Sequence, residues 1–322
     1  MKAFVTGAAG FIGSRLVDEL LRNNWSVSVL VHKRIPSLEE KCKLVQGDIT
    51  DSKNLFKIPA GTDVVFHLAA ALGASLMGRA GFQQVNAEGT DNVITAASRA
   101  GVKRVIHFSS AGVLGAVNSG ETADEDYPLT PKNIYDETKL EGERIALRHA
   151  EDGMDIVVIR PGWVYGPGDR RTFKLIKAIS TKRFILVTKG EKWQTPVYID
   201  DLIQGIFLCV EKGKPGGIYN VAGNEILTVR QITEIIAASA GTRIPRFSLP
   251  LLPLKAAAWI MEKTFRLIKK EAPLTTGKLA FFIHPKPLNI KKAEQALGYS
   301  PCVDFKEGIR MALSWYKQKG WL

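Results

Sequence analysis

The sequence has few cysteines and no long uninterrupted apolar run. Its three cysteines, Cys42, Cys209 and Cys302, are widely spaced and form no CxxC pair. An odd number of scattered cysteines argues against a disulfide framework and a thiolate zinc site, and it is typical of a reducing compartment. A membrane-spanning helix needs about 18 consecutive apolar residues, and no stretch of this chain reaches that length. We therefore expect a cytoplasmic protein without a metal site.

The start of the chain also lacks the pattern of a secretory signal. Met1 and Lys2 lead directly into the apolar residues Ala3–Val5, and a glycine cluster follows at once. A signal peptide needs an apolar stretch of about 7–15 residues. Because 322 residues are too many for one small core, and because 45% of them are hydrophobic, we expect an ordinary globular protein of two coupled lobes.

Acidic residues are outnumbered by basic ones. There are 44 lysines and arginines against 32 aspartates and glutamates, which gives a formal net charge of +12. Such an excess can favour anionic ligands, nucleic acid or an acidic membrane surface, but it can equally be a solvated basic surface. The chain shows no helix-turn-helix, zinc-finger or aromatic-platform pattern, so we expect no nucleic-acid partner.

Apolar, β-branched runs alternate with helical patterns in the first half of the chain. Helical patterns cover Ile12–Asn23 and Thr90–Ala100, and the strand-like runs are Ala3–Val5, Val27–Val31, Asp63–His67, Arg104–Phe108 and Ile156–Ile159. This alternation favours right-handed crossovers and an α/β fold with a doubly wound parallel sheet. After Pro161 the pattern loosens into Gly/Pro-rich turns and separate helices. We therefore predict one domain over residues 1–165 and a smaller, mainly helical substrate-binding lobe over 166–322, with their segments interleaved.

A glycine-rich turn follows the first predicted strand and opens the first predicted helix. Gly7, Gly10 and Gly13 are spaced as GxxGxxG around Phe11 and Ile12. Glycines let the backbone approach a pyrophosphate closely, and the N–H groups at a helix start bind its charge. The spacing differs from the standard GxGxxG fingerprint, but the position between strand and helix favours a dinucleotide cofactor.

Two segments bear on the choice of cofactor, the end of the predicted strand Val27–Val31 and Gly47-Asp48-Ile49, which ends a further predicted strand. A carboxylate after the second strand would bind the ribose 2′-hydroxyl of NAD. The strand ends instead in His32, Lys33 and Arg34. Two cations here would pair with a 2′-phosphate, so we predict NADP as the preferred cofactor and NAD as the alternative. Asp48, which precedes Ile49, could accept from the adenine amino group or serve as a turn residue or helix cap.

Tyr135 and Lys139 begin a predicted helix and are four residues apart, which places them on one face. The nearby ammonium, with the positive nicotinamide of an oxidised cofactor, would lower the pKa of Tyr135 below its usual value of about 10. A YxxxK pair alone is weak evidence. Ser110, however, follows the strand Arg104–Phe108, at the carboxyl edge where open α/β sheets place their ligands. Ser110 could hold a substrate carbonyl or hydroxyl against Tyr135.

Further motifs accompany these residues in a fixed order. They are Phe66-His67-Leu68-Ala69-Ala70, Val85-Asn86-Ala87-Glu88-Gly89-Thr90, Arg160-Pro161-Gly162-Trp163-Val164-Tyr165-Gly166-Pro167-Gly168 and Val197-Tyr198-Ile199-Asp200-Asp201. Together with the glycine turn and the Tyr135/Lys139 pair, they resemble the extended short-chain dehydrogenases/reductases over nearly the whole chain. The resemblance implies a Rossmann fold that binds NAD(P).

The resemblance also implies roles for individual residues. Ser110, Tyr135 and Lys139 match the catalytic residues, and Asn86 matches an asparagine that supports a proton-relay water. His67 has no evident ligand partners, and we interpret it as structural. The implied cofactor site combines the residues of the three regions above with the cleft residues, namely Gly7, Gly10, Phe11, Ile12, Gly13, His32, Lys33, Arg34, Asp48, Ile49, Ala69, Ala70, Tyr135, Lys139 and Pro161.

Two departures favour the reductase and dehydrogenase branch over the nucleotide-sugar branch of this family. Leu114 stands where the sugar enzymes carry a tyrosine that faces the substrate, and Gln194 stands where they tend to carry an arginine for the diphosphate. The region around Leu297–Pro301 and Trp315-Tyr316 is similar to 3β-hydroxysteroid dehydrogenases and dihydroflavonol 4-reductases. We therefore predict interconversion of a ketone and a secondary alcohol on a fairly apolar, sterol-, flavonol- or 3-ketoacyl-like substrate.

Two other functions stay open at this point. A nucleotide-sugar epimerase or dehydratase would explain a basic cluster that could bind phosphate, formed by Arg170, Arg171, Lys174, Lys177, Lys182, Arg183, Lys189 and Lys192. A scaffold that senses the cofactor without chemistry is the second alternative, but such relatives usually lose the tyrosine or the lysine, and both are present here. We expect a small-molecule substrate and a homodimer.

The segment Leu254–Lys270 combines an apolar stripe with basic residues. Trp259 could anchor it at an interface, and the stripe consists of Leu254, Ala258, Met261, Phe265 and Ile268. Such a helix could lie on a membrane surface. A helix packed on its own lobe or at a subunit contact has the same pattern, and we expect one of these arrangements.

Overall fold

The computed structural model describes the chain except for residues 33–35, 73–76, 246, 269–271 and 273. A seven-stranded sheet lies at its centre, with the strand order β11-β6-β5-β4-β1-β2-β3. Every neighbouring pair is parallel. The strands are β1 (Lys2–Thr6), β2 (Ser26–Val31), β3 (Lys43–Gln46), β4 (Val64–His67), β5 (Arg104–Phe108), β6 (Ile156–Pro161) and β11 (Ile218–Val221). The predicted doubly wound parallel sheet is confirmed.

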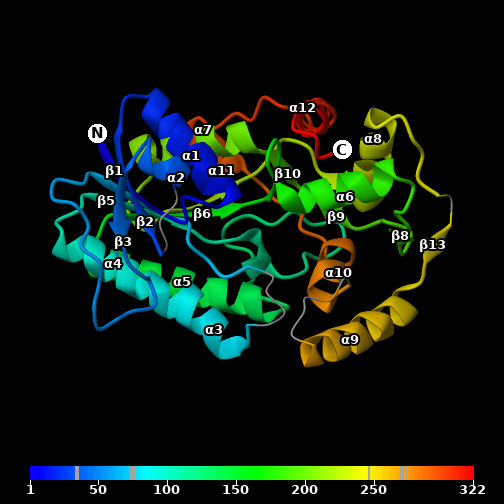
Figure 1. Cartoon of the computed structure of the whole chain (residues 1–322), viewed down its shortest axis with the longest axis horizontal. Helices are drawn as coiled ribbons and strands as arrows, with labels where there is room; N and C mark the ends of the chain where they lie inside the picture. The colour runs from blue at the N-terminus through cyan, green and yellow to red at the C-terminus, as the bar shows by residue number, and fades with distance from the viewer. Residues whose placement is uncertain (33–35, 73–76, 246, 269–271, 273) are drawn as a thin grey trace.

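Helices cover both faces of this sheet, because a parallel sheet must bury its apolar side chains on each side. One layer contains α1 (Phe11–Arg22), α7 (Ile199–Lys212) and α11 (Lys291–Leu297), and the other contains α4 (Gly89–Arg99) and α5 (Ile134–Glu151). Figure 1 shows α1 and α7 on one side of the strands, and α4 and α5 on the opposite side. The short helices α2 (Pro36–Glu39) and α3 (Arg79–Gln83) complete the first half.

The second half contributes directly to this central sheet. Strand β11 pairs with β6 in the register Ile218↔Val158. Helix α7 packs against β5 and β6, and α11 packs against β11. Side chains such as Leu202, Ile206 and Leu297 are fully buried in the same core as Leu16 of α1. Segments after residue 165 therefore complete the layer that begins with α1.

The remaining elements form the lobe that is predicted to bind the substrate. It contains α6 (Arg170–Ser180), α8 (Val229–Ser239), α9 (Leu251–Leu267), α10 (Thr276–Ile283) and α12 (Phe305–Gln318). Three short strand pairs connect them: β7 (Trp163–Tyr165) with β10 (Pro196–Tyr198), β9 (Trp193–Gln194) with β12 (Leu227–Thr228), and β8 (Leu186–Val187) with β13 (Ser248–Leu249). The mainly helical character predicted for this part of the chain is confirmed.

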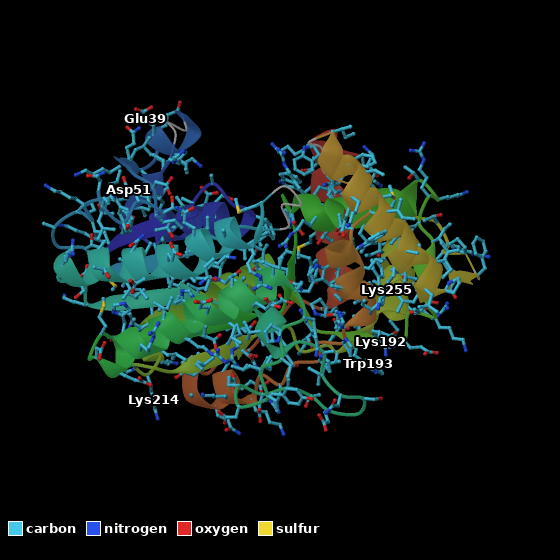
Figure 2. All side chains as sticks on the ribbon, turned by 90° about the horizontal axis from the view of Figure 1, so that it is seen from below. Glu39, Asp51, Lys192, Trp193, Lys214 and Lys255 are labelled. Atoms are coloured by element: carbon cyan, nitrogen blue, oxygen red, sulfur yellow. The ribbon has the colours of Figure 1, made fainter. Side chains whose placement is uncertain are left out.

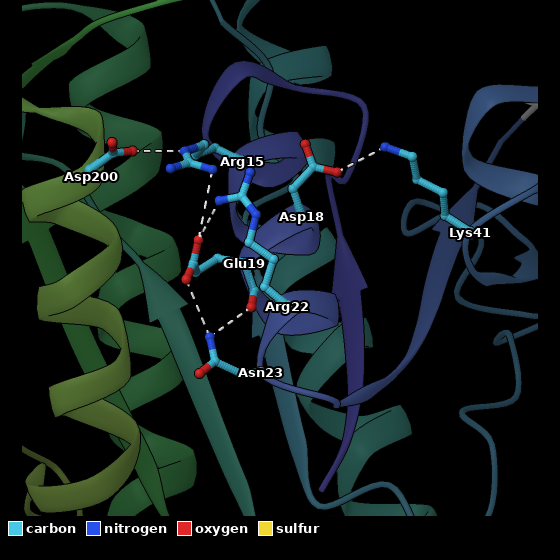
Figure 3. Close-up of polar contacts among 7 residues, drawn as sticks. All are labelled: Arg15, Asp18, Glu19, Arg22, Asn23, Lys41 and Asp200. Atoms are coloured by element: carbon cyan, nitrogen blue, oxygen red, sulfur yellow. Dashed lines mark hydrogen bonds and ion pairs between the residues drawn. The ribbon is translucent and has the colours of Figure 1, made fainter.

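Ion pairs hold α1 in place on the sheet (Figure 3). Arg15 Nε donates to Asp200 Oδ1 of α7 at 2.7 Å. Lys41 Nζ lies 3.0 Å from Asp18 Oδ1, so α1 is also tied to the segment before β3. Glu19 pairs with Arg22 on the same helix at 2.8 Å. These contacts orient the N-terminus of α1 toward the carboxyl edge of the sheet, where the candidate site lies.

Candidate active site

The glycine turn after β1 forms a close-packed loop. Gly7 has a φ of +74°, and a Cβ there would lie 2.7 Å from the Ala69 nitrogen. At Gly13, a Cβ would lie 2.2 Å from the Gly7 carbonyl oxygen. Only glycine fits either position. The structure thereby brings Gly7 against Ala69 at the end of β4, as a cofactor cleft between these two loops requires.

The start of α1 provides hydrogen-bond donors for a phosphate group. Gly10 is the N-cap residue of α1 and makes no side-chain cap. The first N–H groups of a helix have no partner within the helix, and the helix dipole favours an anion there. Phe11 and Ile12 begin this first turn. A glycine loop without Cβ atoms and a helix start without a capping side chain fit a dinucleotide pyrophosphate.

His67 lies buried at the end of β4. Its Nδ1 is 2.8 Å from Thr6 Oγ1, and its Nε2 is 3.1 Å from Thr90 Oγ1. Burial lowers the pKa of His67 to about 3, so the ring stays neutral at physiological pH. Thr6 Oγ1 also accepts from the Ala69 nitrogen at 3.2 Å. This arrangement gives His67 a structural place, beneath the loop that carries Ala69 and Ala70.

The predicted adenosine end is formed in part by described residues. Asp48 Oδ1 accepts from both the nitrogen and the hydroxyl of Thr50 at 2.8 Å. Asp48 Oδ2 lies 3.3 Å from Nδ1 of His32, and the Thr50 bonds hold the pKa of Asp48 below its usual value. Asp48 therefore shapes the turn after β3, one of its expected roles. Ile49 is buried in the core, while Lys33 and Arg34 lie outside the described residues.

Three predicted catalytic residues come together after β5. Ser110 starts a short 3₁₀ turn, and its Oγ accepts from the Gly112 nitrogen at 3.0 Å. Tyr135 stands in the first turn of α5, near enough to Ser110 for the serine hydroxyl to lower the pKa of the phenol. Lys139 lies one turn later and is buried, and its Nζ donates to the Phe108 carbonyl at 2.5 Å. The three side chains share the carboxyl end of β5.

The pKa of Tyr135 lies above its usual value in the chain alone. Burial raises the pKa of Tyr135 to about 12, the charge of Asp136 raises it further, and Arg171 and Ser110 oppose the rise. Burial also lowers the pKa of Lys139 to about 8. The predicted lowering of the tyrosine pKa by Lys139 also relied on the positive nicotinamide of an oxidised cofactor, and it stays a prediction. In the chain alone, the Lys139 amine is directed at the Phe108 carbonyl.

A buried ion pair lies below the catalytic lysine. Glu143 follows Lys139 by one turn of α5, and its carboxylate accepts from Arg160 Nε at 3.0 Å and Nη2 at 2.6 Å. Ser109 Oγ donates to the same carboxylate at 2.5 Å. Glu143 and Arg160 each expose 1% of the side chain, and the charge of Glu143 raises the pKa of Lys139 against the effect of burial. The sequence analysis missed Glu143, although its i+4 spacing from Lys139 was the available signal.

Asn86 connects the loop after β4 to α5. It lies in a π-helical turn, Gln84–Glu88. Its Oδ1 accepts from the Ala71 nitrogen at 2.8 Å, and its Nδ2 donates to Thr138 Oγ1 at 3.0 Å. Thr138 is the residue before Lys139. Asn86 therefore packs against the turn of α5 that carries the catalytic pair.

The two departures from the sugar enzymes have structural counterparts. Leu114 is fully buried in the main core. Gln194 is also buried, and its Nε2 donates to the carbonyls of Phe281 at 2.8 Å and His284 at 2.9 Å. Gln194 thus fastens the end of α10 to β9, and both protons of its amide are used within the protein. Pro161 is half-buried and is the last residue of β6, at the carboxyl end of that strand.

Metal ligands and membrane spans were sought in the described part of the chain. No group of three or more His, Cys, Asp or Glu side chains there could hold a metal ion. The three cysteines are free. Among the same residues, no helix is both long and apolar enough to cross a membrane.

The fold agrees with the results of comparison with known proteins. A family model described as the NAD dependent epimerase/dehydratase family matches residues 3–222. The chain belongs to this family, within the extended short-chain dehydrogenases/reductases, and it is an enzyme of the oxidoreductase class. The family predicted from the ordered motifs is confirmed.

Three relatives illustrate the range of activities in this family. A "4-hydroxy-2-methyl-3-oxo-4-farnesyl-3,4-dihydroquinoline-1-oxide ketoreductase" of Stigmatella aurantiaca is 30% identical, over 96% of this chain and 95% of that protein. A "3 beta-hydroxysteroid dehydrogenase/Delta 5-->4-isomerase" of Mycobacterium tuberculosis is 31% identical, over 98% and 90%. The crystal structure of DesIV, a dTDP-glucose 4,6-dehydratase from Streptomyces venezuelae with NAD bound, is 28% identical, covers 100% and 98%, and has a TM-score of 0.77.

Proposed function

We propose that this protein interconverts a ketone and a secondary alcohol by hydride transfer to or from NAD(P), on a fairly apolar substrate. The observation that carries the proposal is the placement of Ser110, Tyr135 and the buried Lys139 together at the carboxyl end of β5. A bound nicotinamide would supply or accept the hydride. The residues of the chain would then hold the substrate oxygen and transfer one proton to or from it.

The geometry assigns that task to two hydroxyl groups. In the reductive direction, Tyr135 gives its phenolic proton to the carbonyl oxygen while the carbonyl carbon gains the hydride, so the product is a neutral alcohol. Ser110 donates to the same oxygen and holds it against Tyr135. Lys139 carries a positive charge on most molecules at neutral pH, since its pKa is about 8, and it stabilises the phenolate that remains. The Glu143–Arg160 pair positions Lys139.

Two buried side chains support the apolar substrate class. Leu114 is buried in the core, and the amide of the buried Gln194 donates to a backbone carbonyl of the protein. Neither side chain therefore offers a polar group to a nucleotide diphosphate. The ketoreductase and hydroxysteroid dehydrogenase relatives are named for farnesylated and steroid substrates, which are apolar. These names support the substrate class without specifying the molecule.

We further propose NADP as the preferred cofactor. The residues after β2 support this preference, because His32 is exposed there and Lys33 and Arg34 follow it in the sequence. Asp48 faces His32 and is engaged with Thr50. NAD is the alternative cofactor, because the family model that matches this chain is described as NAD dependent.

A nucleotide-sugar epimerase or dehydratase is the second candidate. The similarity to DesIV favours it, and so does Arg171, an exposed cation at the start of α6 whose charge acts on Tyr135. Such an enzyme returns the hydride to its substrate, so it shows no net change in cofactor absorbance.

One experiment separates these functions. Sterols, flavonols, 3-ketoacyl compounds and nucleotide sugars are each incubated with NADPH, NADH and the oxidised forms, and both nicotinamide absorbance and product are recorded. We expect stoichiometric oxidation of NADPH with one of the apolar ketones. A converted nucleotide sugar without net absorbance change would establish the second candidate, and a clear NADH preference would contradict the cofactor proposal.

A further inference from the structure

The exposed apolar side chains of this protein are concentrated at one end of the substrate lobe. Twelve large hydrophobic residues are exposed in the described part of the chain, and eight of them lie between residues 185 and 268. They are Ile185, Trp193, Phe247, Leu249, Leu252, Trp259, Ile260 and Ile268. Strand β13 pairs with β8 in the register Ser248↔Leu186, so the two parts of this surface meet next to the start of α9.

Helix α9 has two apolar faces, and only one of them is covered. Leu251, Leu254 and Ala258 pack on Val187 and on Leu279 of α10. The opposite face is open to solvent. Leu252 is 80% exposed, Trp259 56% and Ile260 54%. Leu254 and Ala258 of the predicted stripe therefore pack on the protein's own lobe, as expected. The exposed apolar residues of α9 lie on its other face.

Basic side chains are interleaved with this outward face. Lys255 and Lys263 are exposed on α9, and Lys263 Nζ lies 4.9 Å above the Trp259 ring. Figure 2 shows Lys255 on the same side of the molecule as Lys192 and Trp193, and far from Asp51 and Glu39. Among the described residues of α9 and of the segment 189–193, the acidic ones are Glu191 and Glu262.

Residues 284–286 are hydrogen-bonded to β9, the strand that carries Trp193. The Lys286 nitrogen donates to the Trp193 carbonyl at 2.8 Å. His284 accepts from Gln194 through its carbonyl at 2.9 Å, and the charge of Lys255 acts on the His284 ring. We use the name α9 surface for Lys192, Trp193, Leu252, Lys255, Trp259, Ile260 and Lys263.

We infer that the α9 surface binds the surface of an anionic phospholipid bilayer. Tryptophan prefers the headgroup level of a membrane, and lysine stems can extend along apolar surface while the ammonium reaches lipid phosphates. Each lysine near an anionic leaflet contributes favourably to binding. The helix would lie in the plane of the interface, with its inner face still packed on α10.

A second copy of the chain fits this surface less well. A two-fold dimer presents the same patch on both subunits, so it would bring the lysines of α9 near those of its partner. An anionic leaflet supplies the missing negative charge. The inference is independent of the proposed reaction, although a membrane position would bring the substrate lobe close to apolar molecules dissolved in the bilayer.

The test is co-sedimentation of the full chain with two kinds of vesicle, pure phosphatidylcholine and phosphatidylcholine with about one-third phosphatidylglycerol. We expect binding to the anionic vesicles only, and its loss at high salt, because salt screens exposed charges. The Lys255→Glu/Lys263→Glu variant should bind these vesicles at least about tenfold more weakly. The Trp259→Ser/Ile260→Ser variant should also bind more weakly, because it removes the inserted apolar groups.

The matched control is Lys214→Glu/Lys317→Glu, which makes the same change in net charge at exposed positions elsewhere. This control should bind within about twofold of the wild type, because its lysines lie beyond a Debye length from the bilayer. An equal loss of binding in the control, or no binding to either vesicle, overturns the inference. A mass in gel filtration that is double without lipid and single in Trp259→Ser/Ile260→Ser would also overturn it, and would assign the surface to a second copy.

Discussion

Tyr135 is surrounded by groups that favour its protonated form. Burial raises the pKa of Tyr135 to about 12, and Asp136, the next residue, adds a negative charge. Asp136 is itself fixed, because it accepts from Asn133 Nδ2 at 2.7 Å and lies 3.7 Å from Lys286 Nζ. A protonated phenol beside the Ser110 hydroxyl suits proton donation to a carbonyl oxygen.

The first prediction concerns this phenol. Tyr135→Phe removes the proton donor and leaves the ring, so we expect kcat to fall about 10²–10⁴-fold while cofactor binding is unchanged. Steady-state kinetics and fluorescence titration with NADPH measure the two quantities. The matched control is Tyr127→Phe, which removes a hydroxyl bonded to Glu121 at 2.7 Å outside the site. Undiminished turnover in Tyr135→Phe would exclude the assigned role.

The second prediction concerns pH. Reduction needs the protonated phenol, which with a pKa of about 12 is present throughout the neutral range. Oxidation of the alcohol needs the phenolate, a minor species there. We therefore expect kcat/KM for oxidation to rise with pH up to at least about pH 10, and kcat/KM for reduction to stay flat until Lys139 loses its proton near its pKa of about 8. Initial rates in both directions test this, and a reduction rate that increases with pH contradicts it.

At the scale of elements, α5 carries most of the candidate site on one face. Tyr135, Lys139 and Glu143 follow one another at i+4 intervals, and each meets a different group at the end of β5 or β6. Gly142 allows α5 to pack closely on the π-helical turn Gln84–Glu88, because a Cβ there would lie 2.2 Å from the Asn86 carbonyl oxygen. The helix therefore joins the catalytic pair to the buried ion pair beneath it.

The third prediction concerns that ion pair. Glu143→Gln leaves the buried Arg160 without its counter-ion, so we expect the free energy of unfolding to fall by about 3–5 kcal/mol. Glu141→Gln on the exposed side of α5 is the control, and it should change stability by less than about 0.5 kcal/mol. Urea unfolding curves measure both. Equal stabilities for the two variants would show that the Glu143–Arg160 contact contributes little.

At the scale of the whole molecule, the two halves share one core. Strand β11 extends the sheet beside β6, and α7 covers β5 and β6. Residues Ile106, Ile159 and Val157 are completely buried beneath elements that come from both sides of residue 165. The predicted boundary at residue 165 therefore does not separate two folding units.

The fourth prediction follows from this shared core. The fragment 1–165 lacks β11, α7 and α11, so it exposes one face of β5 and β6 together with the edge of β6. We expect this fragment to bind a hydrophobic dye and to unfold without a cooperative transition, whereas the full chain unfolds cooperatively. Circular dichroism during thermal unfolding is the measurement. A sharp transition in the fragment would show that residues 1–165 fold independently.

The sequence predicted well those features that depend on neighbouring residues. Five strand-like runs fall in the sheet with ends within about two residues, since period and β-branching are local properties. The glycine turn is equally local, because Gly7 needs a positive φ. Glu143 and the direction of the Tyr135 pKa were not predictable in this way. They depend on Arg160 and on burial, which arise only when distant segments pack.

By itself, the sequence determined the alternation of strands and helices in the first half, the glycine turn and the family, and it supplied the candidate catalytic residues, because spacing along the chain encodes them. The tertiary structure alone decided that β11 completes the sheet and that the Gln194 amide donates to the carbonyls of Phe281 and His284. It placed Trp259 on the exposed face of α9. It also decided the pKa values of Tyr135 and Lys139. Burial and long-range contacts control all of these, and both exist only after the chain has folded.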